Sequence, residues 1–310
     1  MRPRTPTSFS SGGVRCDAWL YLPKSSDPSP VIVMAHGLGA TKEMRLDAYA
    51  QRFVAAGFVC LVFDYRHFGA SDGTPRQLLS VKKQLADWRA AIAHARSLPQ
   101  VDESYVVAWG TSFGGGHALT LAAEDQGLAA AIAQCPFTDG MASAMAGNPI
   151  INSKVTFAAL RDRVGSLRGA EPLYLPNAAA PGTTSFMNAP DALPGMLAIA
   201  GSDSDFDNRL TARSALDVLR YSPGRHAERI GCPVYVALCD PDTVAPNKPA
   251  ARQLAESPLV EVRTYSVGHF DIYLGEPFEI AVADYLTFLA KHVPANTSDP
   301  LAPSKGHEDE

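Results

Sequence analysis

Three things are scarce in this chain of 310 residues: a basic excess, long apolar runs and paired cysteines. Lys and Arg number 27 against 32 Asp and Glu, which leaves a formal charge of −5, and no basic patch stands out. This balance excludes a typical nucleic-acid-binding protein. No segment nears the roughly 18 unbroken apolar residues of a transmembrane helix, and the first residues lack the apolar core of a signal peptide. We therefore expect no membrane span and no secretion by that route.

The five cysteines are odd in number, widely scattered and without CxxC spacing: Cys16, Cys60, Cys135, Cys232 and Cys239. We interpret them as buried or neutral thiols in a reducing compartment, so we expect a cytoplasmic protein. The hydrophobic share of 46% is too high for a disordered chain, and the length suffices for a large core. Composition thus favours a soluble protein of enzyme size.

Short apolar runs alternate with longer helical patterns, which predicts an α/β fold with a mostly parallel sheet and crossover helices. The expected inner strands are 31–35, 58–63, 105–109, 129–133, 234–238 and 260–265, and 14–22 alternates as an outer antiparallel strand would. The expected helices are 43–56, 78–98, 114–124, 248–255 and 278–289.

The alternation of strands and helices is interrupted at 137–231. This segment contains NPI, EPLYLPN, APGTTS and ALPG, with short helical pieces at 155–164 and 210–221. We predict that this stretch is a cap inserted over the carboxyl edge of the sheet. The core would then comprise 1–136 and 232–293. The polar, proline-rich tail at 294–310 is expected to be disordered.

The sharpest motif is the pentapeptide Gly110-Thr111-Ser112-Phe113-Gly114, which follows an expected strand and opens a glycine- and alanine-rich helix. This is the context that a G-x-S-x-G nucleophile elbow requires. A tight strand-to-helix turn strains the backbone of the nucleophile, and neighbours that bear a Cβ would clash there. We therefore predict Ser112 as a catalytic nucleophile.

A serine hydroxyl needs a base that a third group orients. In this topology the acid and then the base follow the serine, each in a loop after a later strand. Asp240 and Asp242 follow the expected strand 234–238, and His269 follows the expected strand 260–265. The order is therefore correct, with His269 as the base, while spacing leaves both aspartates open. The other histidines come too early in the chain, or lie in a helix, the cap or the tail.

A third component is the sequence Ala35-His36-Gly37-Leu38-Gly39, directly after the expected strand 31–35. Acyl transfer passes through an oxyanion, which preorganised backbone N–H groups stabilise best. We predict that the N–H groups of Leu38 and Phe113 form this oxyanion hole. No HExxH, no His/Cys cluster and no G-x-G-x-x-G after a first strand occurs, so we expect no metal and no cofactor.

Together these residues resemble the α/β-hydrolase superfamily over nearly the whole chain. The sequence is most similar to esterase-like proteins related to X-Pro dipeptidyl-peptidase/acetyl-esterase-type hydrolases and to fungal polyketide transferases. The matching stretches are AHGLGATKEMRLDAYAQRF, FDYRHFGASDGTPRQ, WGTSFGGGHAL, CPFTDG, CDPDTVAP and GHFDIYLGEPFE. The resemblance implies an α/β-hydrolase fold and the triad Ser112, Asp242 and His269. It favours Asp242 over Asp240, because the family's acid stands four residues before the proline that matches Pro246.

The expected cap and the loop after the base supply candidate pocket residues, since apolar, Met-rich lids suit adaptable acyl pockets. These candidates are Met141, Met145, Phe157, Phe186, Phe270 and Tyr273. In the loop DYRHFG, Asp64 and Arg66 are expected to pair and fix the loop rather than to act in catalysis.

The sequence therefore predicts a serine hydrolase that cleaves a carboxylic ester, lactone or thioester of a small molecule through an acyl-enzyme. The alternative is an acyltransferase that hands the acyl group to an alcohol or a carrier-bound acceptor. A peptidase and a non-catalytic binding module of the same fold rank lower. The sequence leaves a homodimer open.

Overall fold

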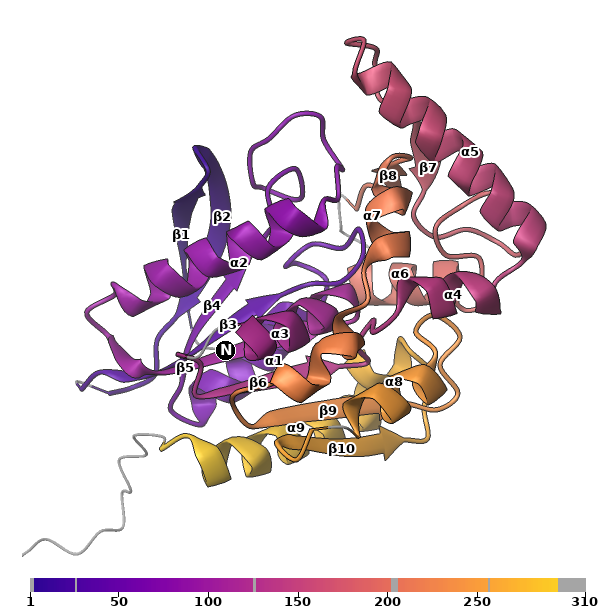
Figure 1. Cartoon of the computed structure of the whole chain (residues 1–310). Helices are drawn as coiled ribbons and strands as arrows, with labels where there is room; N and C mark the ends of the chain where they lie inside the picture. The colour runs from indigo at the N-terminus through magenta and orange to yellow at the C-terminus, as the bar shows by residue number, and fades with distance from the viewer. Residues whose placement is uncertain (1–2, 26, 125–126, 202–205, 256, 295–310) are drawn as a thin grey trace, which may run out of the picture.

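The computed structural model describes residues 3–25, 27–124, 127–201, 206–255 and 257–294. Within these residues the central sheet has eight strands in the order β1-β2-β4-β3-β5-β6-β9-β10 (Figure 1). Their bounds are β1 Arg4–Ser11, β2 Val14–Tyr21, β3 Ser29–Ala35, β4 Val59–Phe63, β5 Val101–Thr111, β6 Ala130–Gln134, β9 Val234–Cys239 and β10 Val260–Tyr265. Pairing is parallel from β4 to β10. The mostly parallel α/β sheet predicted from the sequence is thus confirmed.

Helices cover both faces of the sheet. Residues of α1 and α9 belong to one buried apolar cluster, and residues of α2, α3 and α8 belong to the other. The bounds are α1 Leu46–Ala55, α2 Val81–Arg96, α3 Phe113–Glu124, α8 Asn247–Leu254 and α9 Gly275–His292, with a short 3-10 turn η2 at Asp271–Tyr273. Each of the five helices predicted for the core is present, with ends shifted by a few residues.

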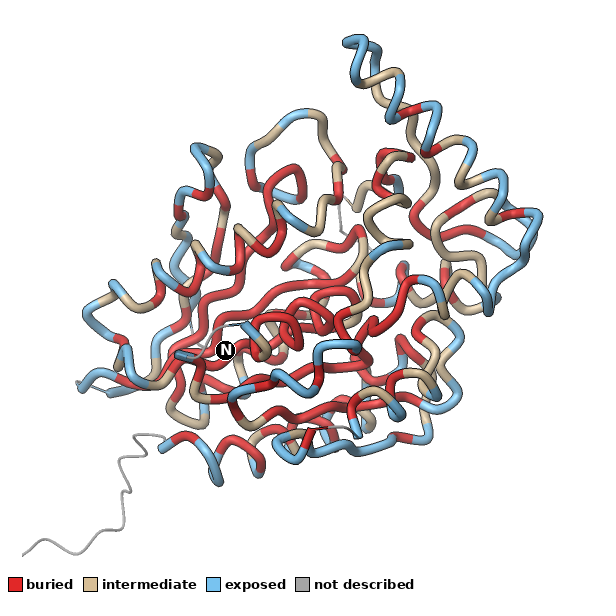
Figure 2. Tube along the Cα trace, in the orientation of Figure 1, coloured by how far each residue is buried: buried red, intermediate tan, exposed pale blue. Residues whose placement is uncertain are grey.

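The strand β3 shows why its sequence is apolar without interruption. Val31 and Val33 pack into the cluster under α2 and α3, whereas Ile32 and Met34 pack into the cluster under α1 and α9. Successive side chains of a strand point to opposite faces, so a strand covered on both sides needs apolar residues at every position. Figure 2 shows the resulting buried band through the middle of the molecule.

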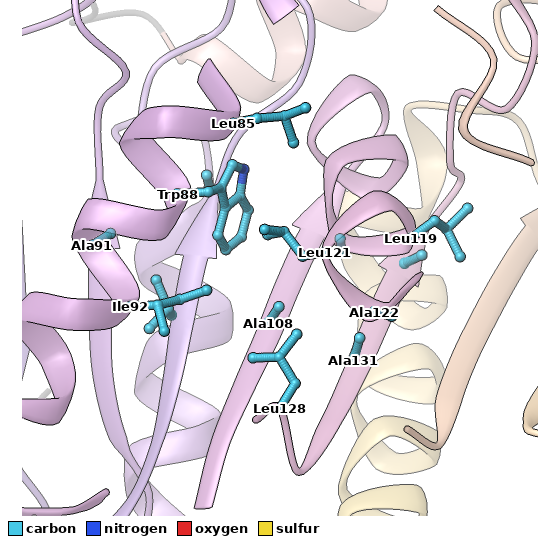
Figure 3. Close-up of a cluster of buried hydrophobic side chains, with 14 of the residues drawn as sticks. Leu85, Trp88, Ala91, Ile92, Ala108, Leu119, Leu121, Ala122, Leu128 and Ala131 are labelled. Carbon is cyan, nitrogen blue, oxygen red and sulfur yellow. The ribbon is translucent and has the colours of Figure 1, made fainter. Parts of the chain in front are cut away.

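Helix α2 is positioned by the apolar stripe that it turns toward the sheet. Leu85, Trp88, Ala91 and Ile92 recur at helical spacing and are buried. Figure 3 shows them facing the small side chain of Ala108 on β5, beside helix α3. The small residues of the central strands let these helices approach the sheet closely.

The amino-terminal part of the sheet differs from the sequence-based expectation. The predicted strand 14–22 is present as β2 and is antiparallel to β4, but it is not the outer strand, because β1 pairs along its other side. The polar sequence RTPTSFSS of β1 has few apolar residues, since an edge strand is half exposed.

The segment 137–231, expected to be a cap, contains short elements joined by irregular stretches. They are α4 Gly140–Ala146, α5 Pro149–Ser166, β7 Tyr174–Pro176, α6 Ala192–Ala200, β8 Arg209–Thr211, α7 Ser214–Arg220 and the 3-10 turn η1 Pro223–Arg229. The predicted helix at 210–221 is wrong at its start, because Arg209–Thr211 pairs with β7 as a strand. The predicted disordered tail lies, after residue 294, outside the described residues.

All five cysteines are buried thiols and none is joined in a disulfide, which agrees with the interpretation of the sequence. Within the described ranges, no helix combines the length and the apolar character needed to cross a membrane.

The order of the strands indicates at which edge of the sheet a binding site is expected. From β3 the chain moves to one side for β4 and returns to the other side for β5, so β3 and β5 are neighbours where the winding reverses. In open α/β sheets the crevice at the carboxyl ends of two such strands is the usual place for a binding site.

Candidate active site

The turn between β5 and α3 presents Ser112 at this edge. Ser112 has a φ of +55°, in the left-handed region that non-glycine residues rarely adopt. A Cβ on Gly110 would lie 2.0 Å from the carbonyl oxygen of Gly114, and one on Gly114 would lie 2.5 Å from that of His36. Only glycine therefore fits at these two motif positions.

Two side chains from the loops after the last two strands of the sheet lie in line with Ser112. The loop after β10 carries His269, whose Nε2 lies 3.0 Å from Ser112 Oγ. The loop after β9 carries Asp242, whose Oδ2 lies 2.7 Å from Nδ1 of His269. The structure thus brings the three predicted catalytic residues into a continuous hydrogen-bonded chain, in the arrangement that activates a serine.

The two aspartates after β9 occupy different surroundings. The Asp242 carboxylate is 1% exposed, and its Oδ1 accepts hydrogen bonds from the N–H groups of Val244 at 2.8 Å and Ala245 at 2.7 Å. Asp240 is exposed, and its Oδ1 accepts a hydrogen bond from Asn247 Nδ2 at 3.2 Å. Backbone donors hold Asp242 against the imidazole, so the geometry favours Asp242, as the resemblance did.

The electrostatics of His269 suit a base that must carry a positive charge briefly. Burial is the largest single influence on the pKa of His269 and lowers it, but Asp242 and Cys135 together raise the pKa well above the ordinary 6.5. Cys135 Sγ lies 3.9 Å from Nε2 of the imidazole. Among the groups that raise this pKa, Asp242 has the largest influence.

The loop after β3 lies directly against the nucleophile. A Cβ on Gly37 would come within 2.8 Å of Ser112 Cβ, so a glycine is needed for the loop to pack there. Leu38 and Phe113, the two predicted oxyanion donors, both line the cavity in front of Ser112. Their backbone positions on either side of the nucleophile suit a pair of N–H donors for a developing oxyanion.

Two buried side chains that sequence reasoning missed hold this loop. Asn177, from the inserted segment, donates from Nδ2 to the carbonyl oxygen of Leu38 at 3.0 Å. Lys42 Nζ lies 2.6 Å from Asp64 Oδ2, and Asp64 Oδ1 accepts from the Lys42 backbone N–H at 2.7 Å. No motif signals Asn177, because its role depends on a contact between segments that are far apart in the chain.

The expected pair of Asp64 and Arg66 does not form. Asp64 turns to Lys42 instead, while Arg66 pairs with the buried Asp87 on α2, with Nε 2.7 Å from its Oδ1. Each of the two side chains thus has its charged partner on another segment of the chain. The prediction that both residues fix the loop rather than react agrees with these contacts.

A cavity of about 350 Å³ opens in front of Ser112, between the sheet edge and the inserted segment. The described residues that line it include Phe137, Val155, Phe186, Met187 and Leu219, together with Asn148, Asn152 and Asn188. None of the described lining residues carries a charge. The arrangement suits a neutral, largely apolar ligand with a few hydrogen-bonding groups.

The six predicted pocket residues fall into three groups. Phe186 lines the cavity, and Phe270 and Tyr273 border a smaller hollow on the other side of Ser112. Met141, Met145 and Phe157 are 48%, 79% and 71% exposed and do not belong to the cavity wall. Their assignment to the pocket is therefore corrected: the apolar pattern was real, but these side chains point outward.

The remaining histidines that lie near the sheet edge make structural contacts. His117 is bonded through Nδ1 to Tyr221 and through Nε2 to Gln84, and burial lowers its pKa to about 3. His36 is buried, and its Nδ1 lies 3.1 Å from the carbonyl oxygen of Gly37. Within the described residues no three His, Cys, Asp or Glu side chains are grouped as metal ligands.

With this geometry in place, comparison with known proteins becomes informative. The sequence profile of the X-Pro dipeptidyl-peptidase (S15) family matches residues 12–242. The chain belongs to this family of α/β hydrolases. The S15 match covers the loop after β3 and the turn that carries Ser112, and it ends at Asp242, before His269.

Curated relatives of this S15-family chain carry names from more than one kind of activity. The quorum-quenching protein AidA of Acinetobacter baumannii is 53% identical over 94% of this chain and 97% of its own length. The polyketide transferase grgF of a Penicillium species is 34% identical over 56% of this chain and 57% of its own length. These relatives support the conclusion that the protein is an enzyme, because hydrolases and transferases are among its homologues.

Solved structures agree on the fold of this S15-family member. The α/β hydrolase GrgF from Penicillium has a TM-score of 0.80 and 27% identity, and the likeness covers 94% of this chain and 99% of that one. The structure of DcsB, a complex with a substrate analogue, has a TM-score of 0.82 and 24% identity over 94% of this chain and all of that one. The α/β-hydrolase fold expected from the sequence is confirmed.

Proposed function

We propose that this protein is a serine hydrolase that cleaves a carboxylic ester, lactone or thioester through an acyl-enzyme. The observation that carries the proposal is the hydrogen-bonded chain from Ser112 Oγ through His269 to Asp242, at 3.0 Å and 2.7 Å. The three side chains follow three different strands, β5, β10 and β9, whose carboxyl ends share one edge. A structural role alone does not require a strained serine at the mouth of a cavity.

In the proposed reaction the three hydrogen-bonded side chains act in the usual order for such a triad. Ser112 Oγ attacks the carbonyl carbon while His269 Nε2 takes its proton. Asp242 keeps Nδ1 protonated and stabilises the imidazolium that forms. His269 then gives the proton to the leaving oxygen or sulfur, which departs and leaves an acyl ester on Ser112. A water, deprotonated in turn by His269, attacks the acyl carbon, and His269 returns that proton to Ser112 Oγ as it leaves, which releases the carboxylic acid.

Between these steps the carbonyl oxygen carries a negative charge. The proposed donors to it are the N–H groups of Leu38 and Phe113, which flank Ser112 in the cavity wall. Removing one such donor costs an acyl-transfer enzyme about 3 kcal/mol of transition-state stabilisation. Because these donors are backbone groups, substitution of the Leu38 side chain is expected to have a mild effect.

The inserted segment 137–231 is proposed as the cap of this enzyme, over a core formed by 1–136 and 232–293. It supplies most of the cavity wall opposite the triad, including Asn152 and Val155 on α5. We propose a neutral acylated small molecule as substrate, because the described wall residues carry no charge. The relative named as a quorum-quenching protein directs attention to a small signal molecule as substrate.

A direct test uses p-nitrophenyl acyl esters and a fluorophosphonate probe. Ser112→Ala is expected to lose essentially all hydrolysis and all labelling. Ser143→Ala, which changes another serine on the cavity wall, is the matched control and should keep the labelling. Retained hydrolysis or labelling in Ser112→Ala would overturn the assignment.

The second candidate is an acyltransferase that uses the same acyl-enzyme but passes the acyl group to an alcohol or a carrier-bound acceptor. Relatives named polyketide transferases favour it, including one from Aspergillus fumigatus that is 30% identical over 91% of this chain. Partition of the acyl group between water and added alcohol separates the two. Hydrolysis alone at high alcohol concentration would contradict transfer.

Two further readings rank lower. Peptide cleavage from a free amino terminus needs an anion for the ammonium group, and no described residue of the cavity wall is acidic. A non-catalytic binding module would not need a complete triad. A cytoplasmic location stays a proposal, supported by the five buried cysteine thiols outside any disulfide.

A further inference from the structure

Helix α5 exposes an apolar stripe on its outer face. The side chains of Ile150, Phe157, Leu160, Val164 and Leu167 are all exposed. At 3.6 residues per turn they fall within about 100° of the helix circumference. The opposite face of α5 is the one that packs inward, through Ile151, Ala159 and Asp162. In Figure 1 the helix stands away from the sheet, and Figure 2 shows its outer edge as exposed.

This pattern is the reverse of an ordinary surface helix, whose outward face is polar. The stripe continues into α4, where Met141 and Met145 are exposed as well. Seven of the exposed large apolar side chains thus lie within 27 consecutive positions, 141–167. Such a patch on a protein surface marks an interaction site.

Basic side chains border the stripe. Lys154, Arg161, Arg163 and Arg168 are exposed, and none forms an ion pair within the described part of the chain. The only acidic residues in the sequence of 141–171 are Asp162 and Glu171, and Asp162 is buried against Arg213. A local surplus of positive charge therefore surrounds the apolar stripe, on a chain whose formal charge is −5.

We infer that the outer face of α4 and α5 docks on an anionic lipid surface. An apolar stripe with Phe and Leu, bordered by Lys and Arg, is the pattern by which a helix lies in the interface of a negatively charged bilayer. The apolar side chains enter the acyl boundary, while the four basic side chains contact the phosphate-bearing headgroups.

A second copy of the chain is a poorer occupant for this face. In a two-fold antiparallel pairing of α5, the basic border of one helix lies beside the basic border of the other. Arg161 then faces its own symmetry mate, and Lys154 faces the Arg168 of the second copy. With no exposed acidic residue on α5, nothing offsets this repulsion.

Docking would connect the lipid surface to the cavity. The inward side of α5 lines the cavity in front of Ser112 through Asn152, Val155 and Thr156, and α4 contributes Ser143 and Ala144. The helices that would contact the bilayer are therefore also the wall of the cavity. Lipophilic neutral esters concentrate in bilayers, so this face would bring the cavity to its substrate. The docking itself does not depend on the proposed chemistry.

The test is co-sedimentation of the full-length protein with vesicles. We expect binding to equimolar phosphatidylglycerol and phosphatidylcholine, at least tenfold weaker binding to phosphatidylcholine alone, and release as NaCl rises from about 0.05 M to about 0.5 M. Leu160→Ser/Val164→Ser and, separately, Arg161→Glu/Arg168→Glu should each weaken binding at least tenfold.

A matched double variant removes apolar side chains of similar exposure elsewhere. Val262 belongs to β10 and Ile280 to α9, two elements that lie away from α5 (Figure 1), so Val262→Ser/Ile280→Ser should leave binding unchanged. Ester hydrolysis in vesicle-free solution reports whether each variant is folded. Equal binding to both vesicle types, or unchanged binding of the two α5 variants, would overturn the inference. So would a wild-type dimer in light scattering that Leu160→Ser/Val164→Ser converts to a monomer.

Discussion

The two sides of the cavity are held in place by different means. On the sheet side, Ser112, Asp242 and His269 sit in turns that directly follow strands, where backbone hydrogen bonds and close glycine packing fix them. On the opposite side, the inserted segment is held by side chains such as Asn177, which reaches the carbonyl oxygen of Leu38. We propose that the sheet edge determines whether a reaction occurs, whereas the inserted segment determines which substrate reacts. Changes on the first side should lower kcat broadly, and changes on the second should alter selectivity.

The largest expected effect separates the two aspartates after β9. Asp242→Asn should lower kcat/KM about 10⁴-fold, because the amide no longer keeps the imidazole in the reactive tautomer. Asp240→Asn is the matched control and should stay within about twofold, since Asp240 is exposed and bonded to Asn247. Kinetics on p-nitrophenyl esters measure both, and a large loss in Asp240→Asn would reverse the assignment.

We also expect the wild type and Asp242→Asn to differ in the pH dependence of kcat/KM. His269 must be neutral to act as a base, so kcat/KM should fall as pH drops through its pKa, which lies well above 6.5. In Asp242→Asn burial acts without the carboxylate and lowers that pKa, so the residual activity should persist to lower pH. A pH profile that keeps the wild-type acid limb in Asp242→Asn would contradict this account of the base.

A smaller but still large loss of kcat is expected from a substitution in the nucleophile elbow. Gly114→Ala adds a Cβ 2.5 Å from the carbonyl oxygen of His36, so the elbow or the oxyanion loop must shift. Displacement of reacting groups by about 1 Å can cost 10²-fold in rate, and we expect kcat to fall by about that factor. Gly165→Ala on α5 is the control, because its Cβ meets Ala170 at an ordinary 3.5 Å. Equal kinetics for the two variants would show that the elbow has more room than the structure gives it.

This contrast also explains how much the sequence could predict. The sheet, its helices and the candidates Ser112 and His269 could be predicted because local patterns encode them: apolar strands, a glycine elbow and polar residues after strand ends. Local pattern left Asp240 and Asp242 open, and only the family resemblance favoured Asp242. The strand β1 was missed because an edge strand needs few apolar residues. Asn177 was missed because its role arises from contact between distant segments. Phe157 was misplaced because an apolar residue in a helix does not show which face is buried.

Asn177 connects the inserted segment to the loop after β3 on the sheet side of the cavity. Its variants therefore test whether the two sides of the cavity act independently. Asn177→Ala removes the donor to the Leu38 carbonyl, which we expect to lower kcat about five- to tenfold through a looser oxyanion loop, with little change in KM. Asn177→Asp keeps the shape but places an acceptor against that carbonyl, so it should lose at least as much. A wild-type kcat in Asn177→Asp would show that the hydrogen bond does not position the loop.

The smallest expected effect lies wholly on the inserted side. Val155 and Phe157 are close in the sequence of α5, but Val155 lines the cavity whereas Phe157 is on the outer surface. Val155→Phe should fill part of the 350 Å³ cavity and reduce kcat/KM for long acyl esters about tenfold, while acetyl esters change less than about twofold. Phe157→Val, the reverse exchange on the opposite face, should leave the chain-length profile unaltered. A series of p-nitrophenyl esters from acetyl upward measures both profiles. If Phe157→Val shifts the preference and Val155→Phe does not, the acyl chain lies outside this cavity, and the inserted segment selects substrates by another surface.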